Sequence, residues 1–380
     1  MSSWLFIFGR THELSFYELA ALIHDPVTTI TPGVGRVEDP QETIDPGVLI
    51  RALGGTVKIA REKGKIAVLT AEEVLLIFKN EGESLTFGIS LYGEGHLDTR
   101  LLAGVKEGLE RRGIHARYVA GHEGNALSSV VITKQHVKEL ILVRVKDGYI
   151  VGETEAVQDF EAWNARDYGR PYADPKAGML PPKVARMAIN LASASTHSRI
   201  NASRILLDPF CGMGTILGEA LLTGWSVIGS DQSEEAVEKA KKNIEFLQGT
   251  SLQDRKEVPY GLFVSDATHI SEKIAPESID AIVTEPFMGP TVVETENVKN
   301  VIKGLEKLYI GCLREWHKIL KPKGHIVIAL PEYAVGGKTF FVKTIIDRCE
   351  NLGYTVTLGP LEYSRPQAVV RRKFFVLWRT

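Results

Sequence analysis

Cysteine is scarce in this chain of 380 residues, which contains only Cys211, Cys312 and Cys349. An odd and scattered set fits reduced thiols rather than a disulfide framework, and it supplies no zinc site. The ten histidines form no close pairs of the kind that bind metals. We therefore expect neither a disulfide nor a metal centre.

Long hydrophobic runs are absent as well. No uninterrupted apolar run approaches the roughly 20 residues that a membrane-spanning helix needs. The first residues, Met1 to Trp4, lack the basic start and the cleavage site of a signal peptide. We expect a cytoplasmic protein with no membrane partner. The length suits two or three domains, and a hydrophobic content of 44% is enough for well-formed cores.

Net charge is small, −2 in total, but the charges are unevenly distributed. Residues 301–380 carry fourteen Lys and Arg against six Asp and Glu, whereas residues 201–300 carry eight against sixteen. The local excess of positive charge in the last 80 residues is a better indication of a phosphate-binding surface than the net charge of the whole chain. Solvated helix faces and an edge strand would give the same counts, so that interpretation stays open.

The most informative stretch, residues 205–217, has the pattern of a buried strand, a tight turn and a helix. The strand ends in Asp208, the turn contains Gly212 and Gly214, and Thr215 opens a run with helical spacing. In an open α/β sheet such a loop binds a ligand, because backbone amides point outward there. Glycines let the backbone approach a cofactor closely. Taken alone, the loop suits an ordinary strand-to-helix turn or a dinucleotide fold equally well.

Three further strands of this region also end in an acid. The strand over residues 225–231 ends in Asp231, about twenty residues after the glycines, where a carboxylate can accept hydrogen bonds from ribose hydroxyls. Asp266 ends a third strand, and the strand over residues 279–284 runs into Glu285. Because parallel strands end at one edge of a sheet, the four acids are expected around one pocket.

The DPFCGMGT form of residues 208–215 resembles the cofactor loop of class I S-adenosylmethionine (SAM) dependent methyltransferases, in the branch that methylates amino groups. Residues 354–358 and 374–378 form the expected final hairpin, with the antiparallel last strand of that class. The resemblance implies an α/β fold, with a Rossmann-like methyltransferase domain over residues 179–380 and SAM as its cofactor. The implied cofactor-binding residues are Met179, Leu180, Pro181, Asp208, Phe210, Gly212, Gly214, Thr215, Asp231, Gln232, Asp266 and Ala267.

Short strands and helices alternate in the N-terminal part. Residues 1–82 follow the pattern of a ferredoxin-like α+β domain. Residues 83–157 resemble a THUMP domain, an RNA-binding module, through the phrase ALSSVVI at residues 126–132 and the order of the elements, with a helix expected near residues 135–138. This pair of domains occurs in several tRNA-modifying enzymes. A small α+β domain for dimerisation is the alternative.

Residues 158–178 read as a linker that interleaves basic and aromatic side chains, a composition suited to phosphate and base contacts. RDYGRP at residues 166–171, followed by GMLPPKVARMAINLA at residues 178–192, resembles the segment before the SAM loop in THUMP-containing tRNA guanine N2-methyltransferases. In that family the segment helps to close over the methionine end of SAM.

Glu285, Pro286 and Phe287 are the expected catalytic residues. A carboxylate and a backbone carbonyl beside the methyl donor can accept the two N–H groups of an exocyclic amine, and an aromatic face can stack on the base. The usual pattern in amino-methyltransferases is Asp or Asn, Pro, Pro, aromatic, whereas this chain has Glu-Pro-Phe-Met. Glu is one methylene longer, so the acceptor can be displaced by about an ångström. A structural acid in a degenerate site is the alternative.

The family resemblance implies methylation of the exocyclic N2 amine of a guanosine in tRNA, usually guanosine 10. The alternatives are an N6-adenine or N4-cytosine methyltransferase acting on DNA or another RNA, and a catalytically silent protein that binds SAM and RNA. The sequence does not decide between one methyl group and two, or whether a small activating subunit is a further partner. The candidate RNA contacts are Arg166, Arg170, Arg365, Arg371, Arg372 and Lys373.

Overall fold

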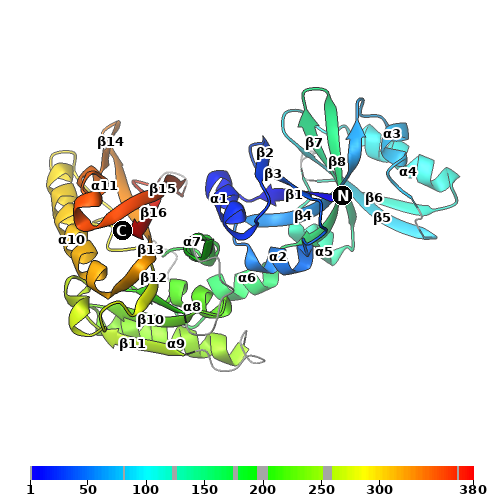
Figure 1. Cartoon of the computed structure of the whole chain (residues 1–380). Helices are drawn as coiled ribbons and strands as arrows, with labels where there is room; N and C mark the ends of the chain where they lie inside the picture. Colours follow the sequence, from blue (N-terminus) through cyan, green and yellow to red (C-terminus); the bar gives the residue numbers. More distant parts are fainter. Residues whose placement is uncertain are drawn as a thin grey trace. The chain divides into compact units, whose positions relative to one another are not determined.

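The computed structural model divides the chain into two compact units, Met1–Ala162 and Trp163–Thr380. Each unit contains its own eight-stranded sheet (Figure 1). The described residues are 2–79, 82–121, 126–173, 179–194, 204–250, 259–365 and 368–380.

The first unit has the strand order β2-β3-β1-β4-β8-β7-β5-β6. The strands of residues 1–82 join those of residues 83–157 through an antiparallel pairing of β4 with β8, from Lys58 opposite Val157 to Ile66 opposite Tyr149. The two expected N-terminal parts therefore share one sheet, and their ferredoxin-like and THUMP-like character stays a prediction. The strands are β1 (Ser2–Phe8), β2 (Val27–Thr31), β3 (Val34–Asp39), β4 (Thr56–Ile66), β5 (Ser84–Tyr92), β6 (His115–Val119), β7 (Lys138–Val145) and β8 (Gly148–Val157).

One helix of this unit differs from the sequence-based expectation. The helix expected near residues 135–138 is wrong, because α5 covers Ser129–Lys134 and Lys138 already begins β7. The Ser128 hydroxyl accepts a hydrogen bond from the Val131 amide at 3.3 Å and caps the helix start. The helices of the first unit are α1 (His12–Leu22), α2 (Pro46–Ala52), α3 (Ala71–Leu75), α4 (Thr99–Arg111) and α5.

A buried ion pair connects four strands of the first sheet. Lys58 Nζ on β4 lies 2.5 Å from Glu139 Oε1 on β7, and it also donates to the carbonyl of Leu127 at 2.7 Å. Ser90 on β5 and Thr154 on β8 donate to the same carboxylate. Burial lowers the pKa of Lys58, and the charge of Glu139 opposes that shift. The network holds the segment before α5 against the sheet.

The second unit has the strand order β11-β10-β9-β12-β13-β16-β15, with β14 paired to β13. Strands β9 to β13 are parallel, and β16 runs antiparallel between β13 and β15. This confirms the expected Rossmann-like sheet with an antiparallel last strand. The strands are β9 (Ile205–Asp208), β10 (Ser226–Asp231), β11 (Tyr260–Val264), β12 (Ile279–Thr284), β13 (Leu320–Val335), β14 (Lys338–Phe341), β15 (Tyr354–Tyr363) and β16 (Val370–Arg379).

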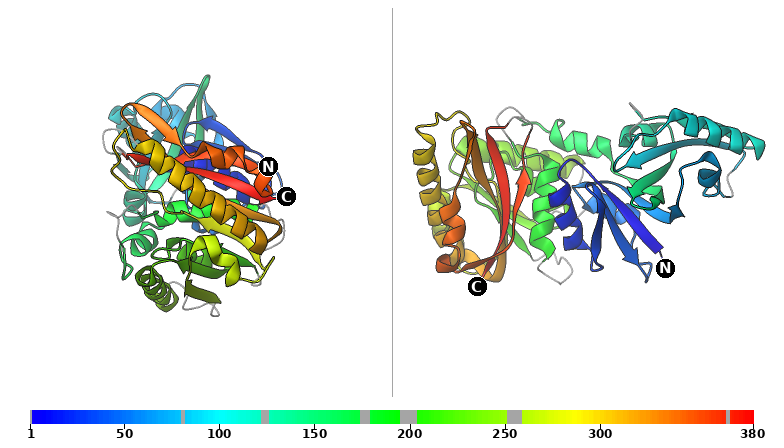
Figure 2. Two further views of the ribbon diagram at one scale, coloured as in Figure 1. Left: turned by 90° about the vertical axis from the view of Figure 1, so that its left-hand side faces the viewer. Right: turned by 90° about the horizontal axis from the view of Figure 1, so that it is seen from above.

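Helices cover both faces of this sheet. Helix α7 packs against α8 on one face, and α10 packs with α11 on the other (Figure 2). The linker expected over residues 158–178 is partly helical, because Phe160–Asp167 forms α6, whereas residues 174–178 lie outside the described part. The helices are α6, α7 (Pro182–Ala194), α8 (Thr215–Leu222), α9 (Glu234–Thr250), α10 (Val298–Ile319) and α11 (Lys343–Asp347), with the short 3₁₀ helices η2 (Ala267–Glu272) and η3 (Glu350–Leu352).

One hydrophobic core of the second unit lies between the sheet and α10. This helix buries a face with helical spacing that includes Tyr309, Cys312 and Trp316. All three cysteines of the chain are free and buried. Among the described residues, no helix has both the length and the apolar character that crossing a membrane requires.

Candidate active site

The carboxyl ends of β9, β10 and β12 border a pocket of about 570 Å³ inside the second unit. The three strand-end acids Asp208, Asp231 and Glu285 line it together. Residues 179–180 and the β15–β16 hairpin around Arg365 and Arg372 also line this pocket. Three of the four acids expected at this edge therefore gather around one pocket.

The glycine loop between β9 and α8 depends on two left-handed residues. Gly212 has φ 49° and Gly214 has φ 78°, values that favour glycine. A Cβ on Gly214 would lie 3.1 Å from that of Ala240, whereas a Cβ on Gly212 would meet nothing within 4 Å. The Gly212 amide donates to Asp231 Oδ2 at 3.0 Å, which fixes the loop relative to β10. The backbone of Gly212 is therefore accessible to a ligand in the pocket that it lines.

Asp208 is almost completely buried at the end of β9. Its Oδ1 accepts hydrogen bonds from Thr284 Oγ1 at 2.7 Å and from the Phe210 amide at 3.2 Å. Burial raises the pKa of Asp208 to about 7, and the nearby charges of Asp231 and Glu285 add to the rise. Asp208 therefore joins β9 to β12, and it titrates near neutral pH.

Glu285 follows the last residue of β12 and forms an ion pair with Arg372 of β16. Arg372 Nε and Nη2 both lie 2.5 Å from Glu285 Oε1. The Glu285 side chain is 16% exposed and the Arg372 side chain is 10% exposed. Burial raises the pKa of Glu285, and the charges of Arg372 and Arg365 reduce that rise. The carboxylate expected to be catalytic thus lines the pocket and is held by an arginine.

Two buried tyrosines hold the loop after Glu285 through hydrogen bonds to its backbone carbonyls. Tyr309 Oη on α10 donates to the carbonyl of Phe287 at 2.6 Å, and Tyr333 Oη on β13 donates to that of Met288 at 2.7 Å. The Phe287 side chain stays 59% exposed, so its ring is accessible to a planar ligand. Sequence reasoning missed both tyrosines. A buried tyrosine needs a partner for its hydroxyl, but the pattern does not reveal which one.

Most of the expected cofactor residues line this pocket, and a few do not. Gly214 caps the start of α8 in the same loop. Asp266 lies beyond the end of β11, where its Oδ1 accepts from the Thr268 amide at 2.8 Å and closes a local turn. Pro181, Gly214, Asp266 and Ala267 are outside the lining. The lining residues among those expected are Met179, Leu180, Asp208, Phe210, Gly212, Thr215, Asp231, Gln232, Glu285, Pro286 and Phe287.

All six basic residues expected to contact RNA make contacts within the second unit. Arg372 is bound to Glu285, and Lys373 lies 2.6 Å from Glu362. Their role in RNA binding stays a prediction. The other contacts join Arg371 to Glu332 at 3.8 Å, Arg166 to Glu219 at 3.0 Å, Arg170 to Thr215 Oγ1 at 2.9 Å and Arg365 to the Met179 carbonyl at 2.9 Å.

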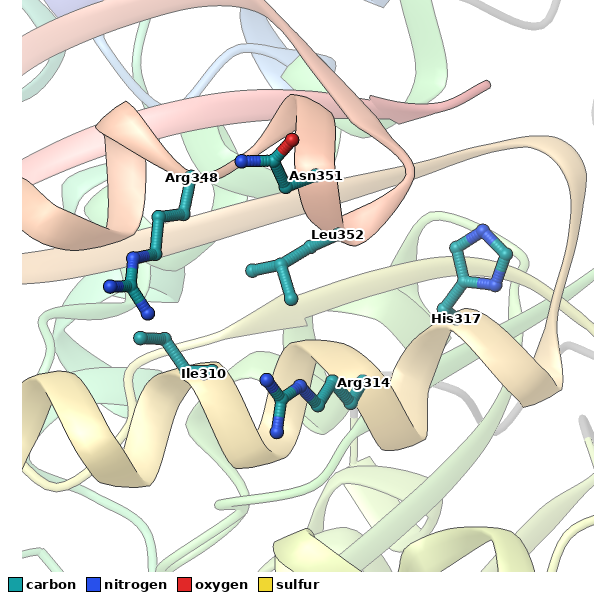
Figure 3. A pocket seen from close by; sticks show the side chains of 6 residues that line it. All are labelled: Ile310, Arg314, His317, Arg348, Asn351 and Leu352. Carbon is teal, nitrogen blue, oxygen red and sulfur yellow. The ribbon is translucent and has the colours of Figure 1, made fainter.

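A second hollow, of about 440 Å³, lies between α10 and the segment from α11 to η3 (Figure 3). Burial and the charge of Arg379 lower the pKa of His317, one of its lining residues. The lining contains no carboxylate and no strand end, so this hollow has none of the features expected for SAM. Its lining residues are Ile310, Arg314, His317, Arg348, Asn351 and Leu352.

The second unit has the features of a class I SAM-dependent methyltransferase domain. A glycine loop follows β9, an acid ends β10, Glu-Pro-Phe follows β12, and the last strand of the sheet is antiparallel. Residues 177–341 match the UPF0020 family, the RMKL-like methyltransferase domain. This part of the chain is a methyltransferase domain of that type, and its cofactor is SAM.

Two curated relatives are both named tRNA (guanine(10)-N2)-dimethyltransferase. The protein of Methanothermobacter thermautotrophicus is 34% identical over 192 residues, 50% of each chain. That of Pyrococcus abyssi is 31% identical over 208 residues, 55% of this chain and 52% of the relative. The chain thus spans about half the length of the curated relatives that it matches.

A solved structure resembles nearly the whole chain. A possible methylase from Clostridium difficile 630 has a TM-score of 0.50 and 14% identity, and the match covers 98% of this chain and 97% of that one. At this identity the likeness shows the fold alone. It supports an N-terminal mixed sheet followed by a methyltransferase sheet.

Proposed function

We propose that the protein transfers a methyl group from SAM to the exocyclic N2 amine of a guanosine in tRNA, with guanosine 10 as the expected target. The observation that carries the proposal is Glu285, a carboxylate that lines the same pocket as the glycine loop and is followed by the exposed ring of Phe287. The names of the two relatives support guanosine in tRNA as the substrate.

The pocket fits SAM in size and in chemistry. Its volume of about 570 Å³ falls within the range of about 300–1,000 Å³ that small-molecule sites have. Gly212 leaves room for close approach, and the two oxygens of Asp231 accept from the amides of Gly212 and Ser233. These bonds fix a carboxylate that would accept hydrogen bonds from the ribose hydroxyls of SAM. Bound SAM supplies an activated methyl group, so the protein has to position the nucleophile.

Glu285 and Pro286 would make the amine a better nucleophile. The lone pair of an exocyclic amine is delocalised into the base. Hydrogen bonds from its two N–H groups to the Glu285 carboxylate and the Pro286 carbonyl would localise that lone pair and stabilise the positive charge that develops on nitrogen. Because burial raises the pKa of Glu285, this carboxylate is also a stronger acceptor for the released proton.

Phe287 would hold the base in place. Its exposed ring offers a stacking surface, and the bond from Tyr309 to its backbone carbonyl fixes the position of that surface. Stacking on an aromatic side chain contributes about 1–3 kcal/mol per base. The base must leave any stack it forms in the RNA before it can reach this ring.

The test measures transfer of radiolabelled methyl from SAM to an unmodified tRNA transcript. Glu285→Gln should lower kcat by about 10²- to 10⁴-fold while SAM binding persists. Glu296→Gln, which changes an exposed acid of the same loop, is the matched control and should keep full activity. A wild-type protein that binds both SAM and tRNA yet transfers nothing would refute the proposal.

The second candidate is methylation of the N6 amine of adenine or the N4 amine of cytosine, in DNA or another RNA. The observation that favours it is the acceptor pair of Glu285 and Pro286, since any exocyclic amine presents the same two N–H groups. Mapping the labelled nucleoside in the product separates the two candidates, because N2-methylguanosine supports the first and a methylated adenosine or cytidine supports the second.

A further inference from the structure

We infer that Arg372 is a positioning residue for Glu285, holding the longer glutamate side chain in the one orientation from which it can accept an N–H of the substrate amine. The inference rests on the proposed function, since it assigns Arg372 a part in the same reaction. It also changes the role expected for Arg372, from a contact with RNA phosphate to a contact with the catalytic carboxylate.

The sheet order places Arg372 within reach of Glu285. Glu285 follows β12, Arg372 lies on β16, and β13 runs between these strands. Arg372 is opposite Pro331 on β13 in the antiparallel register. Neighbouring strands lie about 4.8 Å apart, so the two backbones are about two strand spacings apart. Only a long side chain such as arginine bridges that gap to meet a glutamate.

The contact between the two side chains is specific in its geometry. Nε and Nη2 of Arg372 both reach Oε1 of Glu285 at 2.5 Å. Two donors on one oxygen restrict the rotation of the carboxylate, and Oε2 is the oxygen left for a substrate N–H. Glutamate has one more rotatable bond than aspartate, so without such a contact its carboxylate would sample several rotamers. Arg372 thus offsets the displacement expected from the Glu-Pro-Phe sequence.

Arg372 differs from its two basic neighbours on β16. Side chains alternate between the two faces of a strand, so Arg371 and Lys373 share the face opposite to Arg372. Arg371 and Lys373 are paired with acids that do not line the pocket, whereas Arg372 and its partner Glu285 both do. Of the three consecutive basic residues, Arg372 is the one that belongs to the active site.

Arg372 also affects the protonation of Glu285. Burial raises the pKa of Glu285, and the Arg372 charge opposes the rise. Asp208, Tyr309 and Arg365 also interact electrostatically with this carboxylate, and of these only Arg365 favours its ionised form. Without Arg372 the pKa of Glu285 should rise further, and the carboxylate would be ionised only at higher pH.

The experiment compares Arg372→Met, Arg372→Lys and the control Lys321→Met in methyl transfer to tRNA. Arg372→Met should lower kcat by about 10²-fold, leave SAM binding unchanged and move the acid limb of the pH profile to higher pH. Arg372→Lys keeps the charge but loses the two-donor contact, so kcat should fall several-fold while the acid limb stays in place. Lys321→Met removes an ion pair with Asp280 that lies outside the pocket lining, so it should leave kcat and the pH profile unchanged.

A double-mutant cycle with Glu285→Gln tests whether Arg372 acts through the carboxylate. Arg372→Met should have little further effect on kcat in the Glu285→Gln background. A multiplicative effect in that background would overturn the inference. So would an unchanged kcat with a raised KM for tRNA and a weaker salt dependence, which is the signature of a phosphate contact.

Two further outcomes keep the test decisive. If Arg372→Met does not fold, Arg372→Lys alone decides, because full kcat in that variant would show that the two-donor contact is not needed. If wild-type protein transfers no methyl to tRNA, the proposed function fails. If the wild type is active and Arg372→Met has the same kcat and pH profile, only the inference on Arg372 is overturned.

Discussion

Thr284 donates a hydrogen bond of 2.7 Å to Asp208, a residue that lines the pocket, and this bond joins the carboxyl end of β12 to that of β9. Asp208 is 1% exposed, and burial raises its pKa to about 7. The ionised form of this carboxylate is therefore the costly one in the folded protein. The free energy of unfolding should therefore depend on pH through this one side chain, at the strand end that bears the glycine loop.

Asp208→Asn should abolish that dependence. Because the pKa in the folded protein lies above the ordinary 3.8 of an aspartate, the stabilising contribution is complete below about pH 4 and is lost as the pH rises through about 7. At about 1.4 kcal/mol per pKa unit, the loss has an upper limit of about 4 kcal/mol. Asparagine keeps an acceptor for Thr284, so thermal unfolding without SAM should show the variant to be more stable than wild type at pH 8. Equal stability at pH 5 and pH 8 in both proteins would contradict the argument.

Tyr309→Phe should impair methyl transfer more than it impairs stability. The change removes the hydrogen bond to the Phe287 carbonyl at a cost of about 1 kcal/mol, and it loosens the loop on which the base would stack. Tyr354→Phe is the matched control, because Tyr354 is equally buried and donates to the Leu313 carbonyl at 2.9 Å. Thermal melts and transfer assays should give similar stability losses for both variants and a lower kcat for Tyr309→Phe alone. Equal kcat values would show that the loop needs no such support.

Gly212→Ala should weaken SAM binding. The left-handed φ of 49° costs an alanine about 1–2 kcal/mol, and the added methyl group would project from a residue that lines the pocket. A Kd about tenfold higher by calorimetry is the expected result. Gly304→Ala is the control, since it sits in α10 with nothing within 4 Å of an added Cβ. That change should raise stability by about 0.5–1 kcal/mol and leave SAM binding alone, whereas weaker binding in both variants would argue against a local effect.

Lys58→Met should strongly destabilise the first unit. Lys58 and Glu139 have side-chain exposures of 2% and 0%, and removing one partner of a buried pair costs about 3–5 kcal/mol. Replacing both, as Lys58→Met with Glu139→Leu, should recover part of the loss, because no uncompensated charge remains. Chemical denaturation of the two variants checks this. A single variant as stable as the wild type would mean that water or a rearranged partner compensates Glu139.

The cofactor half of the site could be predicted from local sequence. An apolar strand, an acid and two glycines lie within ten residues of one another, and the structure brings Asp208, Gly212 and Asp231 together as parallel strands require. The strand, the turn and the helix depend on neighbours in the chain, and the hydrophobic period reports them directly. The antiparallel last strand is predicted from the resemblance to class I methyltransferases, and the structure confirms it.

The Glu285–Arg372 pair could not be predicted, because it joins residues 87 positions apart. It depends on β16 lying beside β13 and on which face of β16 each side chain occupies. The spacing of residues 340–352 predicts one helix, and for a related reason the structure bears this out only in part, as α11 and η3. Phe340 and Phe341 pair with β13 as strand β14, so α11 begins only at Lys343. Tertiary pairing overrides a helical period in so short a segment.

The most direct test of the central claim compares two tRNA transcripts that differ at one base. Inosine lacks only the exocyclic N2 amine of guanosine, so a transcript with inosine at position 10 keeps the rest of the substrate. We predict that wild-type protein transfers radiolabelled methyl from SAM to the guanosine transcript, that Glu285→Gln transfers at least 10²-fold more slowly, and that the inosine transcript accepts none. Equal labelling of the two transcripts by the wild-type protein would show that the N2 amine of this guanosine is not the methyl acceptor.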